Sequence, residues 1–186
     1  MRSWPKVYIP ELSERFEVPQ LSLFNSASAA LSPVPKQDTY RIYVCGITPY
    51  DATHLGHAAT YLIFDVMIRY LKASGADVKF VQNITDIDDP LLERAIRDCV
   101  DWQELANSQI ELFRGDMSDL HVIPPDHYIG VIEAMPLVID AVTKLDEKKC
   151  TYLVQGDKYF RVHSDPHFGE RSDLTEADAL NIFAER

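Results

Sequence analysis

The chain has 186 residues, of which 46% are hydrophobic and 25% are charged, and its formal net charge at pH 7 is -11. This composition is typical of a globular protein, and the length allows one domain and part of another. No apolar run resembles a signal peptide or reaches membrane-spanning length, so we expect a cytoplasmic protein with no membrane partner. The three cysteines lack paired spacing, which argues against a disulfide framework or a CxxC metal knuckle.

Residues 1–39 are expected to form an N-terminal extension without regular helices, because proline cannot continue the interior of a helix. The prolines of this segment are Pro5, Pro10, Pro19, Pro33 and Pro35. Leu21–Phe24 is long enough and apolar enough for one short edge strand.

The next stretch has the pattern of a strand, a helix and a second strand. Arg41–Cys45 and Val78–Gln82 are short apolar runs, and the helix between them begins near Leu55, with Thr53 as its expected N-cap, and stops at Ser74-Gly75. A helix between two such strands predicts a βαβ unit with parallel strands. The residues expected on the buried face of the helix are Leu55, Ala59, Leu62, Ile63, Val66, Met67, Tyr70 and Leu71.

Three groups of chemically useful residues follow the strands or open the helix. They are Cys45–Thr48 after the first strand, His54–His57 at the helix start and Asn83–Asp86 after the second strand. Ligands of such sheets bind at the carboxyl ends of the strands, beside the helix N-terminus. The sequence therefore predicts that these groups converge on one site.

Two histidines at a helix N-terminus predict binding of an anion. The free backbone N–H groups and the helix dipole favour negative charge there, and two imidazoles add donors to phosphate oxygens. Gly56 would let a flat ring or a phosphate approach the backbone. The chain contains neither GxxxxGK[ST] nor GxGxxG, so a glycine-rich phosphate loop is not predicted. The alternative is that His54 and His57 are ordinary surface residues at the start of a helix.

Two more helices and a smaller segment complete the chain. Asp89 is the expected N-cap of a helix with Pro90 at its first position, and a second helix runs from Trp102 to about Leu120. The first is expected to bury Leu91, Leu92, Ala95, Ile96 and Cys99, and the second Leu105, Ala106, Ile110, Phe113 and Met117. Pro124-Pro125 marks a boundary, which divides the chain into 1–39, 40–123 and 124–186.

Residues 124–186 are predicted to form a small α+β segment. Pro136 suits the start of a helix, and Thr151–Val154 and Tyr159–Val162 flank a turn-forming stretch as in a hairpin. A final short helix is expected over Leu174–Arg186. Cys99 and Cys150 are interpreted as packing residues, His163 and His167 as surface residues, and Asp86, Asp88 and Asp89 are not assigned a magnesium site.

The three groups of the predicted site resemble signatures of the class I aminoacyl-tRNA synthetases, in which His54–His57 would be the HIGH signature. Tyr43–Gly46, Tyr50-Asp51 and Asn83–Asp89 resemble the cysteinyl-tRNA synthetase branch. The whole chain is most similar to a related family, the mycothiol-biosynthesis cysteine ligases. The segments that carry this likeness are Ser3–Pro5, Cys45–Asp51, Ala52–Tyr61, Asp89–Ala95 and Leu180–Arg186.

The resemblance implies an α/β fold, namely the first half of a Rossmann-like class I nucleotide-binding fold followed by a connective-peptide insertion. It implies an ATP-dependent ligase that forms cysteinyl-AMP and joins the cysteine to the amine of 1D-myo-inositol 2-amino-2-deoxy-alpha-D-glucopyranoside, a glucosaminyl-inositol. The expected partners are L-cysteine, ATP and this amine. Because the chain is acidic, we expect no nucleic acid as a partner, and we expect a monomer.

The same resemblance assigns roles to individual residues. His54 and His57 would be catalytic and stabilise charge on the phosphates. Cys45 would also bind Zn²⁺, whose open position could take the substrate thiolate and so separate cysteine from serine. Mg²⁺ would accompany ATP. Residues that would contact ATP or the cysteinyl-adenylate are Cys45, Gly46, Ile47, Thr48, Gly56, Thr60, Asn83, Ile84 and Thr85.

The resemblance also implies that the fold continues beyond these residues. In that family Glu185-Arg186 would open a Glu-Arg-Gly-Gly-Asp-Pro motif, followed by the remaining zinc ligands and a KMSKS loop. No such loop sequence occurs here. We therefore expect an N-terminal fragment that is inactive by itself. Two alternatives remain, a fragment of a cysteinyl-tRNA synthetase and a non-catalytic remnant that binds a nucleotide or a protein partner.

Overall fold

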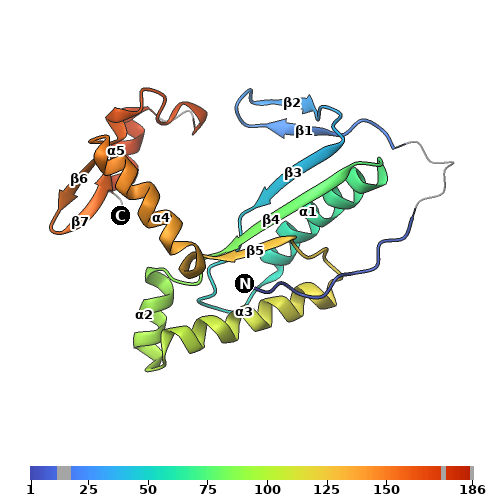
Figure 1. The fold of residues 1–186 in the computed structure, drawn as a ribbon, viewed down its shortest axis with the longest axis horizontal. Helices are drawn as coiled ribbons and strands as arrows, with labels where there is room; N and C mark the ends of the chain where they lie inside the picture. The colour runs from blue at the N-terminus through green and yellow to red at the C-terminus, as the bar shows by residue number, and fades with distance from the viewer. Residues whose placement is uncertain (12–17, 173–174, 185–186) are drawn as a thin grey trace. The chain divides into compact units, whose positions relative to one another are not determined.

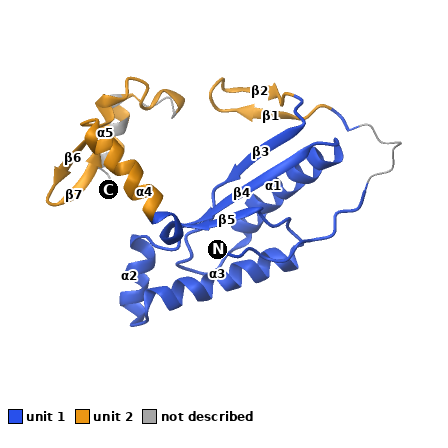
Figure 2. Cartoon of the chain, viewed as in Figure 1, with its two compact units in different colours: residues 1–19, 36–135 blue, residues 20–35, 136–186 orange. Residues whose placement is uncertain are grey.

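The protein is described here by a computed structural model that covers residues 1–11, 18–172 and 175–184. It contains two compact units, the first made of residues 1–19 and 36–135 and the second of residues 20–35 and 136–186 (Figure 2). No helix within the described residues is both long and apolar enough to cross a membrane.

Unit 1 is built on a parallel sheet of three strands in the order β3-β4-β5. The strands are β3 (Thr39–Val44), β4 (Asp77–Ile84) and β5 (His127–Gly130), which lie side by side in Figure 1. The two strands predicted from the sequence are confirmed, and their parallel pairing is confirmed with them. The third strand follows Pro125, so the sheet continues past the boundary expected at residue 124, and the two units divide after Met135.

The sheet buries one face. Along β4, Val78, Phe80, Gln82 and Ile84 are buried, whereas the alternate positions are exposed or half-buried. Successive side chains of a strand point to opposite faces, so this alternation means that one face is packed and the other is largely open. The packed face is covered by helix α1 (Leu55–Ala73), which runs along β4, and by α3 (Trp102–Asp119).

The predicted helix α1 is confirmed, but its buried face is not the predicted one: of the eight residues expected there, Leu71 is buried and the others are exposed or half-buried. Its buried residues are Tyr61, Asp65, Ile68 and Leu71. Leu55, Ile63 and Val66 were expected inside and are 88%, 68% and 64% exposed. At 100° per residue the row of apolar residues lies on nearly the opposite side from the buried row. Apolar side chains occupy both sides of this helix, so periodicity alone selected the wrong one.

Two helices, α2 (Asp89–Asp98) and α3, form the part of unit 1 that the sequence predicted best. All five residues expected inside α3 are buried. In α2 the N-cap is Asp88 rather than Asp89, because the Asp88 carboxylate accepts the N–H of Leu91 at 3.2 Å. Ile96 and Cys99 are exposed, contrary to expectation, and Cys99 ends the helix in the left-handed region with φ 54.

The N-terminal segment contributes to the core of unit 1. Trp4 is buried, and its indole Nε1 donates to the carbonyl of Val122 at 2.8 Å. Its ring lies edge-on to Phe113 and Tyr128, with centroids 5.8 Å apart in each case. Residues 20–35 instead form an antiparallel hairpin of β1 (Ser22–Asn25) and β2 (Ala30–Pro33), which confirms the predicted edge strand.

Unit 2 continues from α4 (Val131–Glu147), which begins in unit 1. Pro136 lies inside this helix and does not start it. The helix begins earlier because the carboxylate of Asp86 accepts the N–H of Ile132 at 3.0 Å, which satisfies one of the free donors at a helix start.

The hairpin predicted after α4 is confirmed as β6 (Thr151–Val154) and β7 (Asp157–Phe160), but β7 begins two residues earlier than the predicted strand and ends before Val162. Its turn consists of Gln155 and Gly156, both with positive φ, which suits a tight hairpin. Two short 3₁₀ helices, Val162–Ser164 and Glu170–Ser172, precede α5 (Glu176–Ala184). The helix α5 was predicted, and the residues at its expected end, Glu185 and Arg186, lie outside the described residues.

Asp65 joins α1 to the segment between α3 and β5, and its removal should destabilise unit 1. Its carboxylate accepts from the N–H of Ile123 at 2.8 Å and from Arg69 Nε at 2.7 Å. In Asp65→Ala the buried N–H of Ile123 loses its partner, so we expect the free energy of unfolding to fall by roughly 2 kcal/mol. Asp65→Asn, which keeps one acceptor, should lose less.

Urea unfolding followed by tryptophan fluorescence would measure this change, since Trp4 and Trp102 both belong to unit 1. Asp77→Ala is the control, because Asp77 and Lys79 form an exposed pair on the same unit. Equal unfolding midpoints for Asp65→Ala and Asp77→Ala would contradict the structural role of Asp65.

Candidate active site

The ends of β3 and β4 are joined by the side chain of Asn83, which lies within the last residues of β4, whereas the sequence had predicted that it follows the strand. Its Oδ1 accepts the N–H of Gly46 at 2.8 Å and the hydroxyl of Tyr43 at 2.9 Å. The N–H of Thr85 then donates to the carbonyl of Ile47 at 2.9 Å. The structure thus brings together two of the three groups of the predicted site, Cys45–Thr48 and Asn83–Asp86.

The backbone of Gly46 passes so close to the backbone of Asn83 that only glycine fits at position 46. A Cβ atom at this position would lie 1.7 Å from the carbonyl oxygen of Asn83. No side chain fits against a backbone atom at that distance, so the position admits glycine alone without movement of a strand.

Cys45 lies between Tyr43 and Gly46, the two residues that donate to Asn83, and it is exposed. Its carbonyl accepts the hydroxyl of the buried Tyr61 at 3.2 Å. Burial, and to a smaller extent the charge of the nearby Cys45 thiolate, raise the pKa of Tyr61, so this hydroxyl stays protonated and available as a donor. Because Tyr61 belongs to α1, this bond attaches the strand end to the helix that carries the histidines.

The N-cap of α1 is His54, and the prediction of Thr53 is corrected here. His54 Nδ1 accepts the N–H of Gly56 at 3.1 Å, and the His54 N–H donates to His57 Nδ1 at 3.2 Å. This is a capping box built from two imidazoles in place of a hydroxyl and a carboxylate. Thr53 uses its hydroxyl elsewhere, as a donor to the carboxylate of Asp116.

The capping box determines which ring nitrogen carries the proton. Nδ1 of each histidine accepts a backbone N–H, so each neutral ring holds its proton on Nε2. The two rings lie with their centroids 4.1 Å apart. The start of α1 therefore carries two neighbouring imidazoles, each with an Nε2–H not used by the capping box, at the positive end of the helix dipole.

The surroundings of His57 favour its neutral form. Burial, and secondly the proximity of His54, lower the pKa of His57 from its ordinary value. Protonation would add a hydrogen to Nδ1 and replace the acceptor that the His54 N–H needs. This local structure therefore stabilises the neutral form of His57, in which Nε2 carries the proton and can donate it.

Two further residues of the predicted site have roles within the helix. A Cβ on Gly56 would lie 2.8 Å from Cε1 of the His54 ring, so the space beside Gly56 is occupied by that ring. The hydroxyl of Thr60 donates to the carbonyl of Gly56 at 3.1 Å, which is a common contact of a helical threonine.

The remaining predicted residues differ in what they expose. The side chains of Ile47 and Ile84 are buried in the core, so a ligand could contact these two residues only through their backbone. Thr48 is half-buried, and its carbonyl accepts the N–H of Tyr50 at 2.9 Å.

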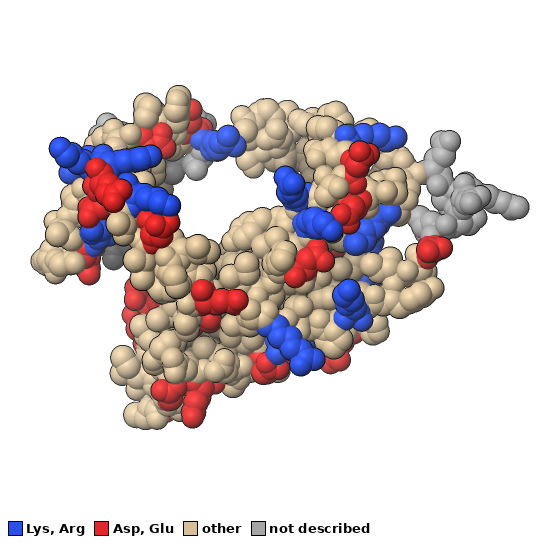
Figure 3. Space-filling view, viewed as in Figure 1, with Lys and Arg blue, Asp and Glu red and all other residues tan. Residues whose placement is uncertain are grey.

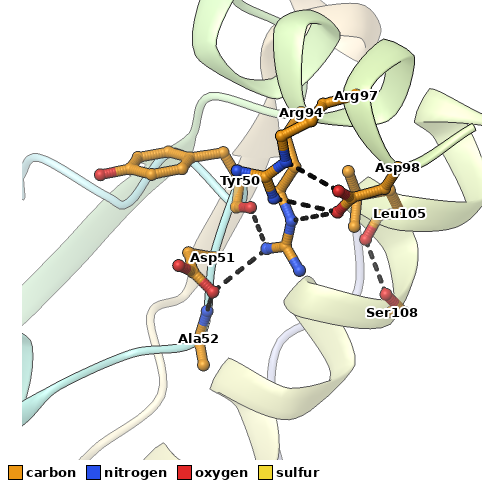
Figure 4. A network of polar contacts seen from close by, with 8 residues as sticks. All are labelled: Tyr50, Asp51, Ala52, Arg94, Arg97, Asp98, Leu105 and Ser108. Atoms are coloured by element: carbon orange, nitrogen blue, oxygen red, sulfur yellow. Dashed lines mark hydrogen bonds and ion pairs between the residues drawn. The ribbon is translucent and has the colours of Figure 1, made fainter.

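The loop before the histidines is also held from α2, by a residue that the sequence analysis missed. Arg94 Nη1 donates to the carbonyl of Tyr50 and contacts the carboxylate of Asp51 at 3.1 Å (Figure 4). Arg94 lies in the resembling segment Asp89–Ala95, but nothing in the sequence indicates this contact, because its partners are more than forty residues earlier in the chain.

Within the described residues, no group of three His, Cys, Asp or Glu side chains is placed to hold a metal ion. Cys45 would be one ligand of the predicted zinc site, and the described residues do not supply the others. Asp86 is buried, and its carboxylate accepts the N–H of Ile132 at 3.0 Å.

A parallel α/β sheet with imidazoles at a helix start, beside the carboxyl ends of two strands, defines a Rossmann-like nucleotide-binding domain. Residues 32–185 match the protein family described as the tRNA synthetases class I (C) catalytic domain. The chain belongs to this family.

Curated relatives place the chain near one group of ligases. It is 50% identical over 190 residues to "L-cysteine:1D-myo-inositol 2-amino-2-deoxy-alpha-D-glucopyranoside ligase" of Thermomonospora curvata. It is 52% identical over 191 residues to "L-cysteine:1D-myo-inositol 2-amino-2-deoxy-alpha-D-glucopyranoside ligase 2" of Corynebacterium jeikeium. Each match covers 100% of this chain and 46% of the relative, so the chain spans about half the length of the curated relatives it matches.

Solved structures support the fold. Two structures of Mycobacterium tuberculosis methionyl-tRNA synthetase with methionyl-adenylate match with TM-scores of 0.54 and 0.51 at 18% and 20% sequence identity. They cover 67% and 66% of this chain, and the chain covers 29% of each. At this identity the likeness shows a shared class I catalytic fold.

Gly46→Ala should disrupt the contact between the two strand ends. The added methyl would overlap the carbonyl oxygen of Asn83, so we expect the free energy of unfolding to fall by about 3 kcal/mol or more. Gly115→Ala is the matched control, because a Cβ there meets nothing within 4 Å. Gly115 lies inside α3, where alanine should raise the stability by about 0.5–1 kcal/mol. In urea unfolding, the midpoint of Gly46→Ala should fall and that of Gly115→Ala should rise. A change of both midpoints in the same direction would refute this account of Gly46.

The capping box should make stability depend on pH. Because the pKa of His57 is lowered in the folded state, its stabilising contribution is complete above the ordinary value of about 6.5. It is lost as the pH falls from there through the lower folded-state pKa. His57→Gln keeps an acceptor at this position and cannot titrate, so its urea midpoint should vary less between about pH 7.5 and pH 5. An equal pH dependence of the two proteins would contradict the role of His57.

Proposed function

We propose that this chain is the nucleotide-binding half of an ATP-dependent ligase that activates L-cysteine as cysteinyl-AMP and joins it to the amine of a glucosaminyl-inositol. The observation that carries the proposal is the pair of Nε2–H donors at the start of α1, at the carboxyl ends of β3 and β4. The identity of about 50% with ligases named for this reaction supports the choice of substrates.

The proposed reaction has two steps. A carboxylate oxygen of cysteine attacks the α-phosphorus of ATP, and the bond to the β-phosphate oxygen breaks, releasing pyrophosphate. The amine nitrogen then attacks the carbonyl carbon of cysteinyl-AMP, the bond to the phosphate oxygen breaks, and AMP and a proton leave. No covalent bond to the enzyme is needed, so positioning and charge stabilisation carry the catalysis.

His54 and His57 are proposed to act on the first step. Negative charge accumulates on the phosphate oxygens as pyrophosphate leaves, and the two Nε2–H groups can donate to them. Their direction is set in advance by the capping box, so little reorganisation is needed at the moment of reaction. The N–H groups of the first turn add a partial positive charge in the same place.

The strand ends are proposed to hold the adenylate. The backbone of Gly46, Ile47, Ile84 and Thr85, and the side chains of Cys45, Thr48, Thr60 and Asn83, are the proposed contacts. Cys45 is proposed in addition as one Zn²⁺ ligand, with the others supplied by residues outside the described part. Mg²⁺ is proposed to accompany ATP.

The acceptor separates this proposal from a second one, a cysteinyl-tRNA synthetase. The family match includes tRNA synthetases, which keeps tRNA as a candidate. The chain carries a net charge of -11, and on the face shown in Figure 3 basic and acidic side chains are interspersed. A surface for RNA phosphates is expected to carry clustered basic residues, so the charge favours the small amine.

Cysteine-dependent exchange between ATP and pyrophosphate would test the proposed activation step. The protein, expressed from its complete reading frame, should catalyse this exchange and should transfer cysteine to the glucosaminyl-inositol. We expect His54→Asn and His57→Asn each to lower the exchange rate by about 100-fold, as for the loss of a transition-state donor.

His163→Asn is the control, because His163 is an exposed residue of unit 2. Residues 1–186 alone should show no exchange. Transfer of cysteine to tRNA in place of the amine would favour the synthetase. Absence of exchange in the protein from the complete reading frame would favour the non-catalytic alternative, and full activity of both histidine variants would refute their proposed role.

A further inference from the structure

We propose that Arg94 and Asp116 are positioning residues that fix the loop between β3 and α1 and thereby hold His54 and His57 in their donor geometry. This inference rests on the proposed function for its catalytic consequence, and its geometric part can be tested without activity. It assigns a role to α2 and α3, whose side chains contribute no residue to the predicted ligand contacts.

Arg94 reaches the loop from α2. Its Nη1 group donates to the backbone carbonyl of Tyr50 and contacts the carboxylate of Asp51, while Nε contacts Asp98 at 3.2 Å. In Figure 4 the guanidinium of Arg94 points at the loop, whereas the ring of Tyr50 points away from it. The bond to the Tyr50 carbonyl is therefore the main attachment, since Asp51 is 69% exposed and an exposed ion pair adds little.

Asp116 holds the same loop from α3. Its carboxylate accepts the hydroxyl of Thr53, the residue directly before the N-cap. Between them, Arg94 and Asp116 attach three of the four residues from Tyr50 to Thr53. The chain enters the helix at His54 with φ -127 and ψ 174, and this entry angle is what the capping box requires.

The two helices are suited to act as a support. Leu91 and Ala95 of α2 pack with Leu105 and Ala106 of α3 in a buried cluster, with Trp102 against it. Arg94 lies next to Ala95 in sequence, so its backbone is fixed by that cluster. A guanidinium on a fixed backbone can hold a loop carbonyl at a defined position, which is the requirement for a preorganised site.

Arg97 provides an internal comparison on the same helix. It is also paired with Asp98, at 2.7 Å, but its side chain is 71% exposed against 22% for Arg94. Arg97 has no hydrogen bond to the loop among the described contacts. Removing either arginine deletes one positive charge from α2, and only the removal of Arg94 releases the loop.

Nuclear magnetic resonance on the 186-residue chain would test the geometric part. In Arg94→Gln the capping box should loosen, so the pKa of His57 should rise towards its ordinary value and the amide of Gly56 should exchange with solvent about tenfold faster. Arg97→Gln should leave both measurements unchanged. Arg94→Lys keeps the charge with a single ammonium group, and we expect it to restore the wild-type values in part.

Asp116→Asn should also accelerate exchange at Gly56, because it weakens the second attachment. Equal values of the His57 pKa and the Gly56 exchange rate in Arg94→Gln, Arg97→Gln and the wild type would overturn the inference. A uniform rise in exchange throughout unit 1 would also overturn it, since that would show a general loss of stability.

Kinetics of the protein from the complete reading frame would test the catalytic part. We expect Arg94→Gln to lower kcat for ATP–pyrophosphate exchange about tenfold while KM for ATP changes less, and Arg97→Gln to change neither. Normal kcat in Arg94→Gln with a loosened capping box would overturn the catalytic consequence. If the wild type shows no exchange, the proposed function fails, and the magnetic resonance measurements still decide the role of Arg94.

Discussion

The parallel pairing of β3 with β4, continued past the end of β3 by Asn83, is the contact on which the site depends. The carboxamide oxygen of Asn83 accepts hydrogen bonds from the N–H of Gly46 and the hydroxyl of Tyr43. The backbone pairing then resumes with the bond from the N–H of Thr85 to the carbonyl of Ile47. A Cβ atom at position 46 would push the strand ends apart, and Cys45–Thr48 and Asn83–Asp86 would move with them. The positions of Cys45–Thr48 and Asn83–Asp86 are therefore determined by the close approach of the two backbones.

The histidines show how a local motif can serve structure and chemistry with the same atoms. Each imidazole has two nitrogens, and the helix start uses Nδ1 of both rings as acceptors. Because Nδ1 accepts a backbone N–H, Nε2 is left as the donor. The same bond opposes protonation of Nδ1 in His57, and burial of His57 likewise lowers its pKa. An aspartate at the N-cap would stabilise the helix equally well, but its carboxylate only accepts hydrogen bonds and would offer no such donor.

Much of the fold and the place of the site could be predicted from the sequence, because the strands of the βαβ unit, the turns and the helix stops are local signals. The β3 and β4 strands, α1, α3 and the β6–β7 hairpin were found in this way. The buried side of α1 was not, because its selection depends on Phe113 and the sheet, far away in sequence. Arg94 and Asp116 were missed for the same reason, since long-range contacts leave no spacing to detect.

The outer side of α1 has a consequence for the behaviour of the chain in solution. Leu55, Ile63 and Val66 form an apolar row there, and Tyr43 of the edge strand β3 is also exposed. Exposed apolar rows and open strand edges are sites of self-association. The apolar row on α1 and the open edge of β3 therefore favour association between copies of the chain as its concentration rises.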